Sequence, residues 1–192
     1  MEAFLVSTGI VALAEIGDKT QLLALVLAAK YRKPVPIILG ILVATLVNHA
    51  VAGYVGAWVA AAIGADLMRW ILGLSFIAMA AWMLVPDKLD DEESAKPARY
   101  GVFLTTFIAF FIVEIGDKTQ IATVALAAKY ASLWAVVGGT TLGMMLANVP
   151  AVLLGEVAAK KLPMRLVHGV AATIFLVLGV LVLLGVGGDL GG

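Results

Sequence analysis

Long apolar stretches alternate with short polar connections along almost the whole chain. Crossing a lipid bilayer takes roughly 20 apolar residues in a helix, and six stretches reach about that length. They cover approximately residues 4–28, 35–62, 67–85, 101–128, 133–159 and 165–186. Lipid offers backbone groups no other partners, and the stretches lack the alternating pattern of a β-barrel, so we expect helices. The sequence predicts an all-α integral membrane protein with six transmembrane helices.

Only one polar segment is long, and it separates two groups of three apolar stretches. The simplest interpretation is a solvated linker, and the alternative is an acidic antechamber that attracts cations. We therefore expect a first three-helix repeat at residues 1–86, an acidic linker at 87–99 and a second three-helix repeat at 100–192. The charged residues of the linker are Asp87, Lys88, Asp90, Asp91, Glu92, Glu93, Lys96 and Arg99.

The composition supports the membrane assignment and excludes several classes of partner. Mean hydropathy is +1.06 and only 14% of residues are charged, against about a quarter in soluble domains. Cysteine is absent, so disulfides and thiolate metal sites are not available. The net charge is zero and the basic residues form no stripe, so no nucleic acid is expected. Residues 1–4 lack the basic start of a secretory signal, so we expect the first apolar stretch to be retained.

Two copies of one sequence, Glu-Ile-Gly-Asp-Lys-Thr, lie inside the first and fourth apolar stretches. They occupy residues 15–20 and 114–119, and the match continues at the same offset through residues 27–31 and 126–130. The halves of the chain are therefore copies of one unit. Because each half has an odd number of helices, the second half must enter the membrane upside down. Inverted three-helix repeats of this kind are typical of transporters.

The distribution of lysine and arginine predicts the orientation in the membrane. The side opposite to the basic connections has only Arg69 and Lys129. The positive-inside bias then places the basic connections and the acidic linker in the cytoplasm and both termini outside. The basic residues after the first, third and fifth stretches are Lys30, Arg32, Lys33, Lys88, Lys96, Arg99, Lys160, Lys161 and Arg165.

Each motif carries two acids and a lysine at a depth where charge is costly. On one continuous helix Glu15 and Asp18 would share a face, as would their counterparts in the second copy. We expect the four carboxylates to converge near the bilayer midplane. A charged side chain at a helix centre costs about 2.5–3.5 kcal/mol, so the six groups would cost on the order of 15–20 kcal/mol if unpaired. The four acids are Glu15, Asp18, Glu114 and Asp117.

Ion pairing inside each motif is the simplest compensation. Glu15 can reach Lys19, and Glu114 can reach Lys118, at the helical spacing of four residues. Each motif then keeps one negative charge, and the two together match one divalent cation. Because intramembrane ionisable groups are by default functional, we interpret the four acids as a cation site.

The remaining motif residues have two interpretations each. Gly17 and Gly116 allow close approach of backbone, or unwinding that exposes a carbonyl ligand, but also plain helix packing. Side-chain oxygens add ligands or hold the carboxylates in place, although a threonine can instead bond to its own helix. The residues concerned are Thr20, Gln21, Thr119 and Gln120.

The second predicted helix of each half carries an asparagine that could add a ligand. Asn48 and Asn148 occupy matching positions after a one-residue slip, and they are candidates for amide ligands or for a helix-to-helix hydrogen bond. Oxygen ligands suit manganese(II), calcium or magnesium better than zinc or copper. Met144 and Met145 would favour manganese if they lined the site, but we interpret this pair on an apolar helix as packing residues.

Two histidines and one acid outside the motifs have ordinary explanations. His49 and His168 are interpreted as structural or interface residues, with proton shuttling by His49 as the alternative. Glu156 lies near the end of its helix, where the side chain can reach the membrane surface.

The twice-repeated Glu-x-Gly-Asp-Lys-Thr resembles the motif of the eukaryotic Golgi manganese/calcium transporter family and its bacterial manganese-exporting members. The resemblance spans nearly the whole chain, and no motif position departs from the pattern. It implies a secondary transporter that exchanges manganese or calcium for protons. The missing N-terminal extension resembles the bacterial version and indicates a cytoplasmic (inner) membrane. The implied cation ligands are Glu15, Asp18, Glu114 and Asp117, flanked by Lys19, Thr20, Lys118 and Thr119.

Export of a divalent cation against an inside-negative potential costs about 4.6 kcal/mol per 100 mV. We therefore expect coupling to protons, which compete with the metal for the carboxylates, and alternating access around a fixed site. Two protons per metal ion would make the exchange electrically neutral. The metal is a substrate, so no cofactor is expected, and the sequence leaves open whether the protein is a homo-oligomer.

Two other functions stay open at this point. One is an exporter of basic amino acids, whose ammonium groups fit among the same acids. The other is an intramembrane aspartyl protease with Asp18 and Asp117 as its dyad. That class of protease carries Gly-x-Gly-Asp, whereas Glu15 replaces the first glycine here.

Overall fold

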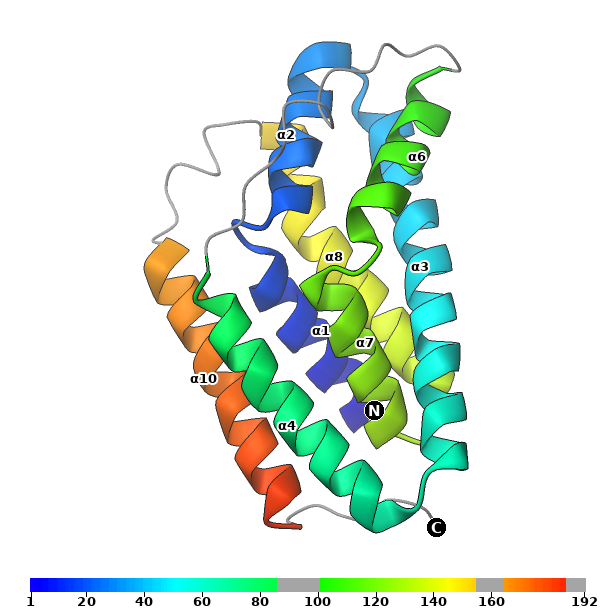
Figure 1. Cartoon of the computed structure of the whole chain (residues 1–192). Coiled ribbons are helices and arrows are strands. Elements are labelled where there is room, and N and C mark those ends of the chain that lie inside the picture. Colours follow the sequence, from blue (N-terminus) through cyan, green and yellow to red (C-terminus); the bar gives the residue numbers. More distant parts are fainter. Residues whose placement is uncertain (86–100, 155–163, 186–192) are drawn as a thin grey trace.

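A computed structural model describes residues 1–85, 101–154 and 164–185 of the chain. The acidic linker, Glu156 and the pair Lys160 and Lys161 lie outside these residues. Every regular element within them is a helix (Figure 1), so the all-α fold class is confirmed. The helices are α1 (Glu2–Glu15), α2 (Lys19–Tyr31), α3 (Pro34–Ala62), α4 (Ala65–Met83), α6 (Val102–Glu114), α7 (Lys118–Lys129), α8 (Leu133–Leu154) and α10 (Met164–Leu183).

Three of these helices are long and apolar enough to cross a bilayer by themselves. They are Pro34–Ala62, Asp66–Met83 and Leu133–Leu154. Val102–Glu114 and His168–Leu183 are apolar but shorter. Together with the composition, these helices support a multi-pass membrane protein.

The first and fourth apolar stretches are each divided into two helices at the motif. Gly17 has φ +83° and Gly116 has φ +76°, a left-handed conformation that a side chain disfavours and that ends a right-handed helix. The residues on either side of each glycine are extended. The prediction that Glu15 and Asp18 share one helix face is therefore wrong, and the helical spacing assumed for pairs inside a motif is absent.

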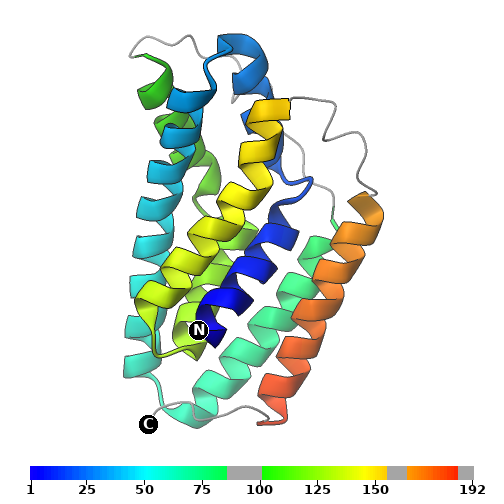
Figure 2. The same ribbon diagram turned by 180° about the vertical axis from the view of Figure 1, so that it is seen from behind.

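The long helix of each half packs on the divided helix of the other half. α3 lies against α6 and α7, and α8 lies against α1 and α2 (Figures 1 and 2). Glycines bring the backbones together: a Cβ added at Gly56 would stand 2.2 Å from the carbonyl oxygen of Val124, and one at Gly139 would stand 2.5 Å from that of Phe4. Such close crossings are how helices associate in lipid, where small residues allow dense packing.

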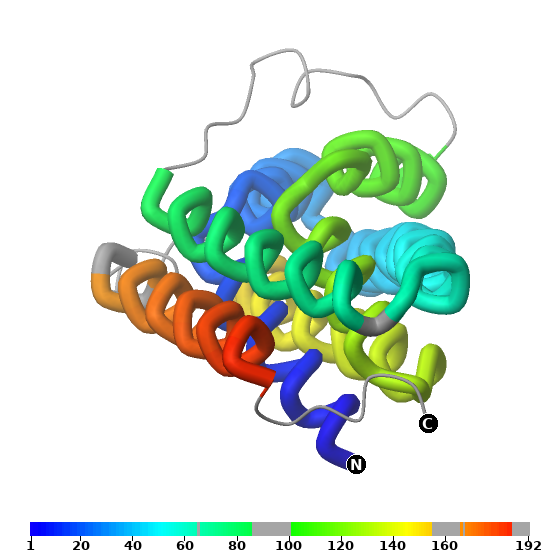
Figure 3. The backbone as a smooth tube through the Cα atoms, turned by 60° about the horizontal axis from the view of Figure 1, so that its bottom comes forward, coloured from blue at the N-terminus to red at the C-terminus, as the bar shows by residue number. Residues whose placement is uncertain are grey.

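α4 and α10 form an antiparallel pair along one side of the bundle (Figures 1 and 3). Gly73 and Gly179 allow their backbones to approach, and the rings of Phe76 and Phe175 lie 6.2 Å apart between them. The pair lies beside the motif of the first half, because His168 Nε2 of α10 is 2.9 Å from the carbonyl oxygen of Ile16.

Candidate cation site

Three of the four motif acids converge in the interior of the bundle. Glu15 ends α1, Glu114 ends α6 and Asp117 immediately precedes α7. Each offers a carboxylate oxygen within 4.8 Å of the others, and none of the three side chains is more than 2% exposed. Since metal–oxygen bonds measure about 2.0–2.6 Å, oxygens at this separation can bind one cation. We call these residues the three-acid cluster.

The cluster contains oxygens that nothing in the described part of the chain satisfies. Glu15 Oε1, both carboxylate oxygens of Glu114 and Asp117 Oδ2 accept no hydrogen bond from residues 1–85, 101–154 or 164–185. Buried polar atoms are normally hydrogen-bonded, because leaving them unpaired is costly, and for a charged group very costly. The arrangement therefore fits a cation as the missing partner of these oxygens.

Each motif lysine pairs with the aspartate of the other motif. Lys19 Nζ lies 3.2 Å from Asp117 Oδ1, and Lys118 Nζ lies 3.6 Å from Asp18 Oδ1. These pairs between motifs take the place of the pairs inside a motif that a continuous helix would form. The two aspartates differ in position. Asp117 belongs to the three-acid cluster, whereas Asp18, the fourth predicted ligand, does not.

The breaks in the helices free the aspartates for these contacts. Asp18 and Asp117 occupy N-cap positions, where an aspartate usually accepts a backbone hydrogen bond, yet neither makes a side-chain cap. Glutamine side chains bind the backbone N–H groups of the motif glycines instead. Gly17 donates to Gln21 Oε1 at 2.9 Å, and Gly116 donates to Gln120 Oε1 at 2.7 Å.

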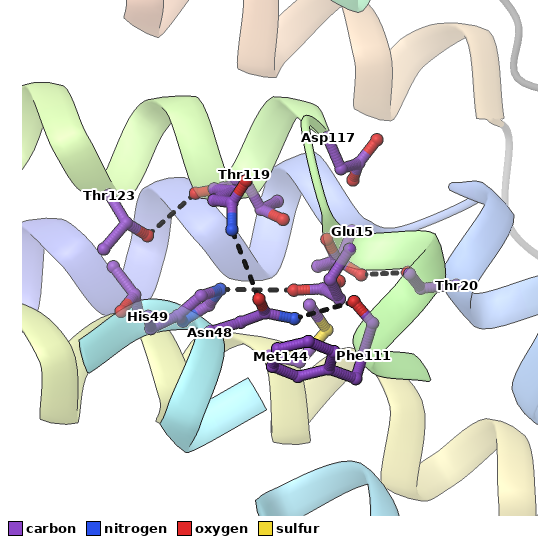
Figure 4. A network of polar contacts seen from close by, with 12 residues as sticks. Glu15, Thr20, Asn48, His49, Phe111, Asp117, Thr119, Thr123 and Met144 are labelled. Carbon is purple, nitrogen blue, oxygen red and sulfur yellow. Dashed lines mark hydrogen bonds and ion pairs between the residues drawn. The ribbon is translucent and has the colours of Figure 1, made fainter. Parts of the chain in front are cut away.

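Glu15 is held by two neighbours, one from each half of the chain, and Figure 4 shows its hydrogen bond with Thr20. The Thr20 hydroxyl donates to Glu15 Oε2, and Asn148 Nδ2 donates to the same oxygen at 3.4 Å. The other oxygen stays available. Thr119, at the matching place of the second motif, is buried, and its carbonyl oxygen accepts from the Thr123 hydroxyl at 2.8 Å.

The two asparagines that the sequence singled out have different surroundings. Asn48 links three helices, because its Nδ2 donates to the carbonyl oxygen of Phe111 at 3.1 Å and its Oδ1 accepts from Gln120 at 3.2 Å (Figure 4). Asn148 Nδ2 also donates to the carbonyl oxygen of Met144 at 3.0 Å. Asn148 Oδ1 accepts no hydrogen bond from the described residues, so it can still serve as a ligand.

Three further residues that contact the motifs were hard to predict from the sequence. His49 is fully buried, and its Nε2 lies 3.4 Å from Glu114 Oε2 (Figure 4); only its place beside Asn48 hinted at this. Lys118 Nζ lies 3.4 Å from the carbonyl oxygen of Val85 and 5.9 Å from the centre of the Trp82 ring. No pattern in the sequence connects these residues, because the contacts depend on how distant helices pack.

Comparison with known proteins shows the family. The description "Divalent cation/proton antiporter GDT1" matches residues 3–91 and 102–189. A Vibrio cholerae protein named "Putative manganese exporter" is 54% identical over 93% of this chain and 88% of its own length. GDT1-like proteins of Synechocystis (26% identical, 91% of this chain and 93% of the relative) and Arabidopsis thaliana (25%, 94% and 94%) also match. No solved structure is significantly similar to the chain.

Proposed function

The chain belongs to the GDT1 family of divalent cation/proton antiporters, and from this premise we propose that it exports manganese from the cytoplasm in exchange for protons. The family consists of transporters, so the protein is not an enzyme, and the metal is its substrate and not a cofactor. Manganese is supported as the substrate by the 54% identity to the Vibrio cholerae protein named "Putative manganese exporter".

We assign the transported ion to the three-acid cluster. The observation that carries this assignment is the convergence of Glu15, Glu114 and Asp117 within 4.8 Å, with oxygens that lack hydrogen bonds inside the described residues. We assign Asn148 Oδ1 as a neutral ligand, because it also accepts no hydrogen bond from the described residues. Oxygen ligands of this kind suit manganese, calcium and magnesium. Asp18, which pairs with Lys118, then acts as a counter-charge.

The proposed architecture is six membrane spans in two inverted repeats. Each divided helix, α1 with α2 and α6 with α7, would form one span, and the identical motifs at both breaks support a duplicated unit. α2 and α8 end near one end of the bundle, whereas Met1 and the ends of α3 and α7 lie near the other (Figures 1 and 2). The basic connection at Lys30 marks the first end as cytoplasmic. We propose an inner-membrane protein with both termini outside, and alternating access by movement of one repeat against the other.

The charge balance of the site supports an exchange of two protons for one metal ion. The cross-motif pairs give each aspartate a lysine, and the two glutamates are the remaining acids of the four. Two protons on the glutamates carry the same charge as one divalent ion. Metal and protons then exclude each other, because metal ligands must be deprotonated.

A proteoliposome assay tests the proposal. Wild-type protein should couple a manganese gradient to proton movement, and Glu15→Gln or Asp117→Asn should abolish both fluxes. The matched control is Glu2→Gln, which replaces an exposed acid at the start of α1 and should keep wild-type flux. Unchanged flux in the site variants would refute the site, and manganese flux without proton movement would refute the exchange.

Binding measurements distinguish this function from transport of basic amino acids. Calorimetry with manganese, calcium and magnesium at two pH values should give tighter manganese binding at the higher pH. Lysine in excess should leave the manganese affinity unchanged, and competition by lysine would favour the amino-acid exporter. An aspartyl dyad has no support, because Asp18 and Asp117 are each paired with a lysine.

A further inference from the structure

The two motif lysines make equivalent pairs but lie in different environments. The Lys118 side chain is 2% exposed, whereas the Lys19 side chain is 23% exposed. Their partners differ as well. Asp117, the partner of Lys19, belongs to the three-acid cluster, and Asp18, the partner of Lys118, does not. The sequence gives no reason for this difference, because the two motifs are identical.

Lys118 is enclosed by protein on several sides. Its ammonium group contacts Asp18, the carbonyl oxygen of Val85 and the face of the Trp82 ring. Freeing it would break all three contacts and leave a buried cation without compensation. Lys118 is therefore a permanent counter-charge of Asp18.

Lys19 lies at a more exposed place than Lys118. It is the first residue of α2, as Lys118 is of α7, so the positive end of a helix dipole opposes both cations and exposure is what distinguishes them. Its ammonium group forms an ion pair with Asp117 Oδ1 at 3.2 Å. A divalent ion in the three-acid cluster would share Asp117 with the Lys19 ammonium group, and the two positive charges would repel each other within a few ångströms.

We propose that Lys19 is an exchangeable internal cation, which pairs with Asp117 when the cluster holds no metal and releases Asp117 when a divalent ion binds. This inference rests on the proposed function, and it adds a competitor that belongs to the chain itself. The ammonium group keeps the metal affinity moderate, so the site can release its ion after the conformational change. Because the Lys19 side chain is partly exposed, it can turn toward solvent after its release.

Trace acetylation of lysines with acetic anhydride tests the exchange directly. Purified wild-type protein is labelled with and without saturating manganese, and peptides are quantified by mass spectrometry. Lys19 should be labelled several-fold faster with manganese, and Lys118 should stay protected under both conditions. In Asp117→Asn, Lys19 should be labelled at the faster rate without metal, and manganese should no longer change it.

An unchanged or slower labelling of Lys19 at saturating manganese would overturn the inference. Calorimetry on the same samples separates this result from failure of the proposed function. If manganese binds and Lys19 does not respond, only the exchange is wrong. If manganese does not bind, the proposed function and the exchange fall together.

A second test compares substitutions that differ in charge. Lys19→Gln should bind manganese roughly tenfold more tightly and turn over more slowly, because the competitor for Asp117 is gone. Lys19→Arg, which keeps the charge, should retain both properties. The matched control is Lys129→Gln, a half-buried lysine at the far end of α7, with wild-type affinity expected. An affinity of Lys19→Gln equal to that of wild type would contradict the proposal.

Discussion

Glu15 and Glu114 occupy the same position in two identical motifs, but the protein surrounds them differently. Glu15 Oε2 accepts hydrogen bonds from Thr20 and Asn148, and its other oxygen is available. Neither oxygen of Glu114 accepts a hydrogen bond from the described residues, and His49 Nε2 is its close neighbour at 3.4 Å. Glu15 is therefore held by two hydrogen bonds, whereas Glu114 has a histidine neighbour and no hydrogen bond within the described residues.

The difference comes from the long helices that cross the breaks. α8 brings Asn148 to Glu15, and α3 brings His49 to Glu114. The residue after Asn48 is this histidine, whereas Val149 follows Asn148. The two motifs thus carry equal sets of acids, and different residues on the neighbouring helices surround them. The same holds for the lysines, because only Lys118 is enclosed by Trp82 and Val85.

The largest expected effect separates the two aspartates. Asp18→Asn should lower the free energy of unfolding by about 3–5 kcal/mol, because it removes the carboxylate that pairs with the buried Lys118 cation. Asp117→Asn should cost only about 0–1 kcal/mol, since Lys19 is partly exposed and can reach solvent. Denaturant titration of both variants in detergent, beside wild type, measures the difference.

Manganese binding should show the opposite order. Asp117→Asn removes a member of the three-acid cluster and should abolish binding, whereas folded Asp18→Asn should keep an affinity close to that of wild type. Equal losses of stability, or equal losses of affinity, would mean that the two motifs are equivalent after all.

A smaller effect is expected from the backbone at the breaks. A Cβ at Gly116 meets no atom within 4 Å, but the residue has φ +76°, so Gly116→Ala should cost about 1–2 kcal/mol of stability through strain alone. Gly169→Ala is the matched control, because that site is equally open and has no positive φ. Thermal unfolding in detergent compares the two. If both variants melt alike, the left-handed turn is not needed.

The smallest effect distinguishes the two asparagines. Asn48→Ala removes hydrogen bonds between helices and should lower stability by roughly 0.6–1.7 kcal/mol, with manganese affinity little changed. Asn148→Ala should weaken manganese binding about tenfold, the equivalent of one lost interaction of roughly 1.4 kcal/mol, because it removes a candidate ligand and a donor to Glu15. Parallel calorimetry and unfolding curves give both values. Loss of affinity in Asn48→Ala alone would reverse the assignment.

Much of the fold and part of the site could be predicted from the sequence. The apolar stretches determine helices, because lipid satisfies no backbone group, and the repeated motif indicates where charge gathers. The family followed from the same twelve residues, and the comparisons confirmed it. The break at Gly17 was only one of several interpretations of that glycine, because glycine also serves helix packing and its φ depends on its surroundings.

What the sequence by itself determined is the chemistry: two carboxylates and one ammonium group, repeated in the same order in a second motif, inside apolar stretches. Only the tertiary structure decided the partners. It placed each lysine on the aspartate of the other motif, kept Asp18 out of the three-acid cluster and brought His49 to Glu114. The physical reason is that identical local sequences leave identical possibilities, and the choice among them depends on contacts with distant helices.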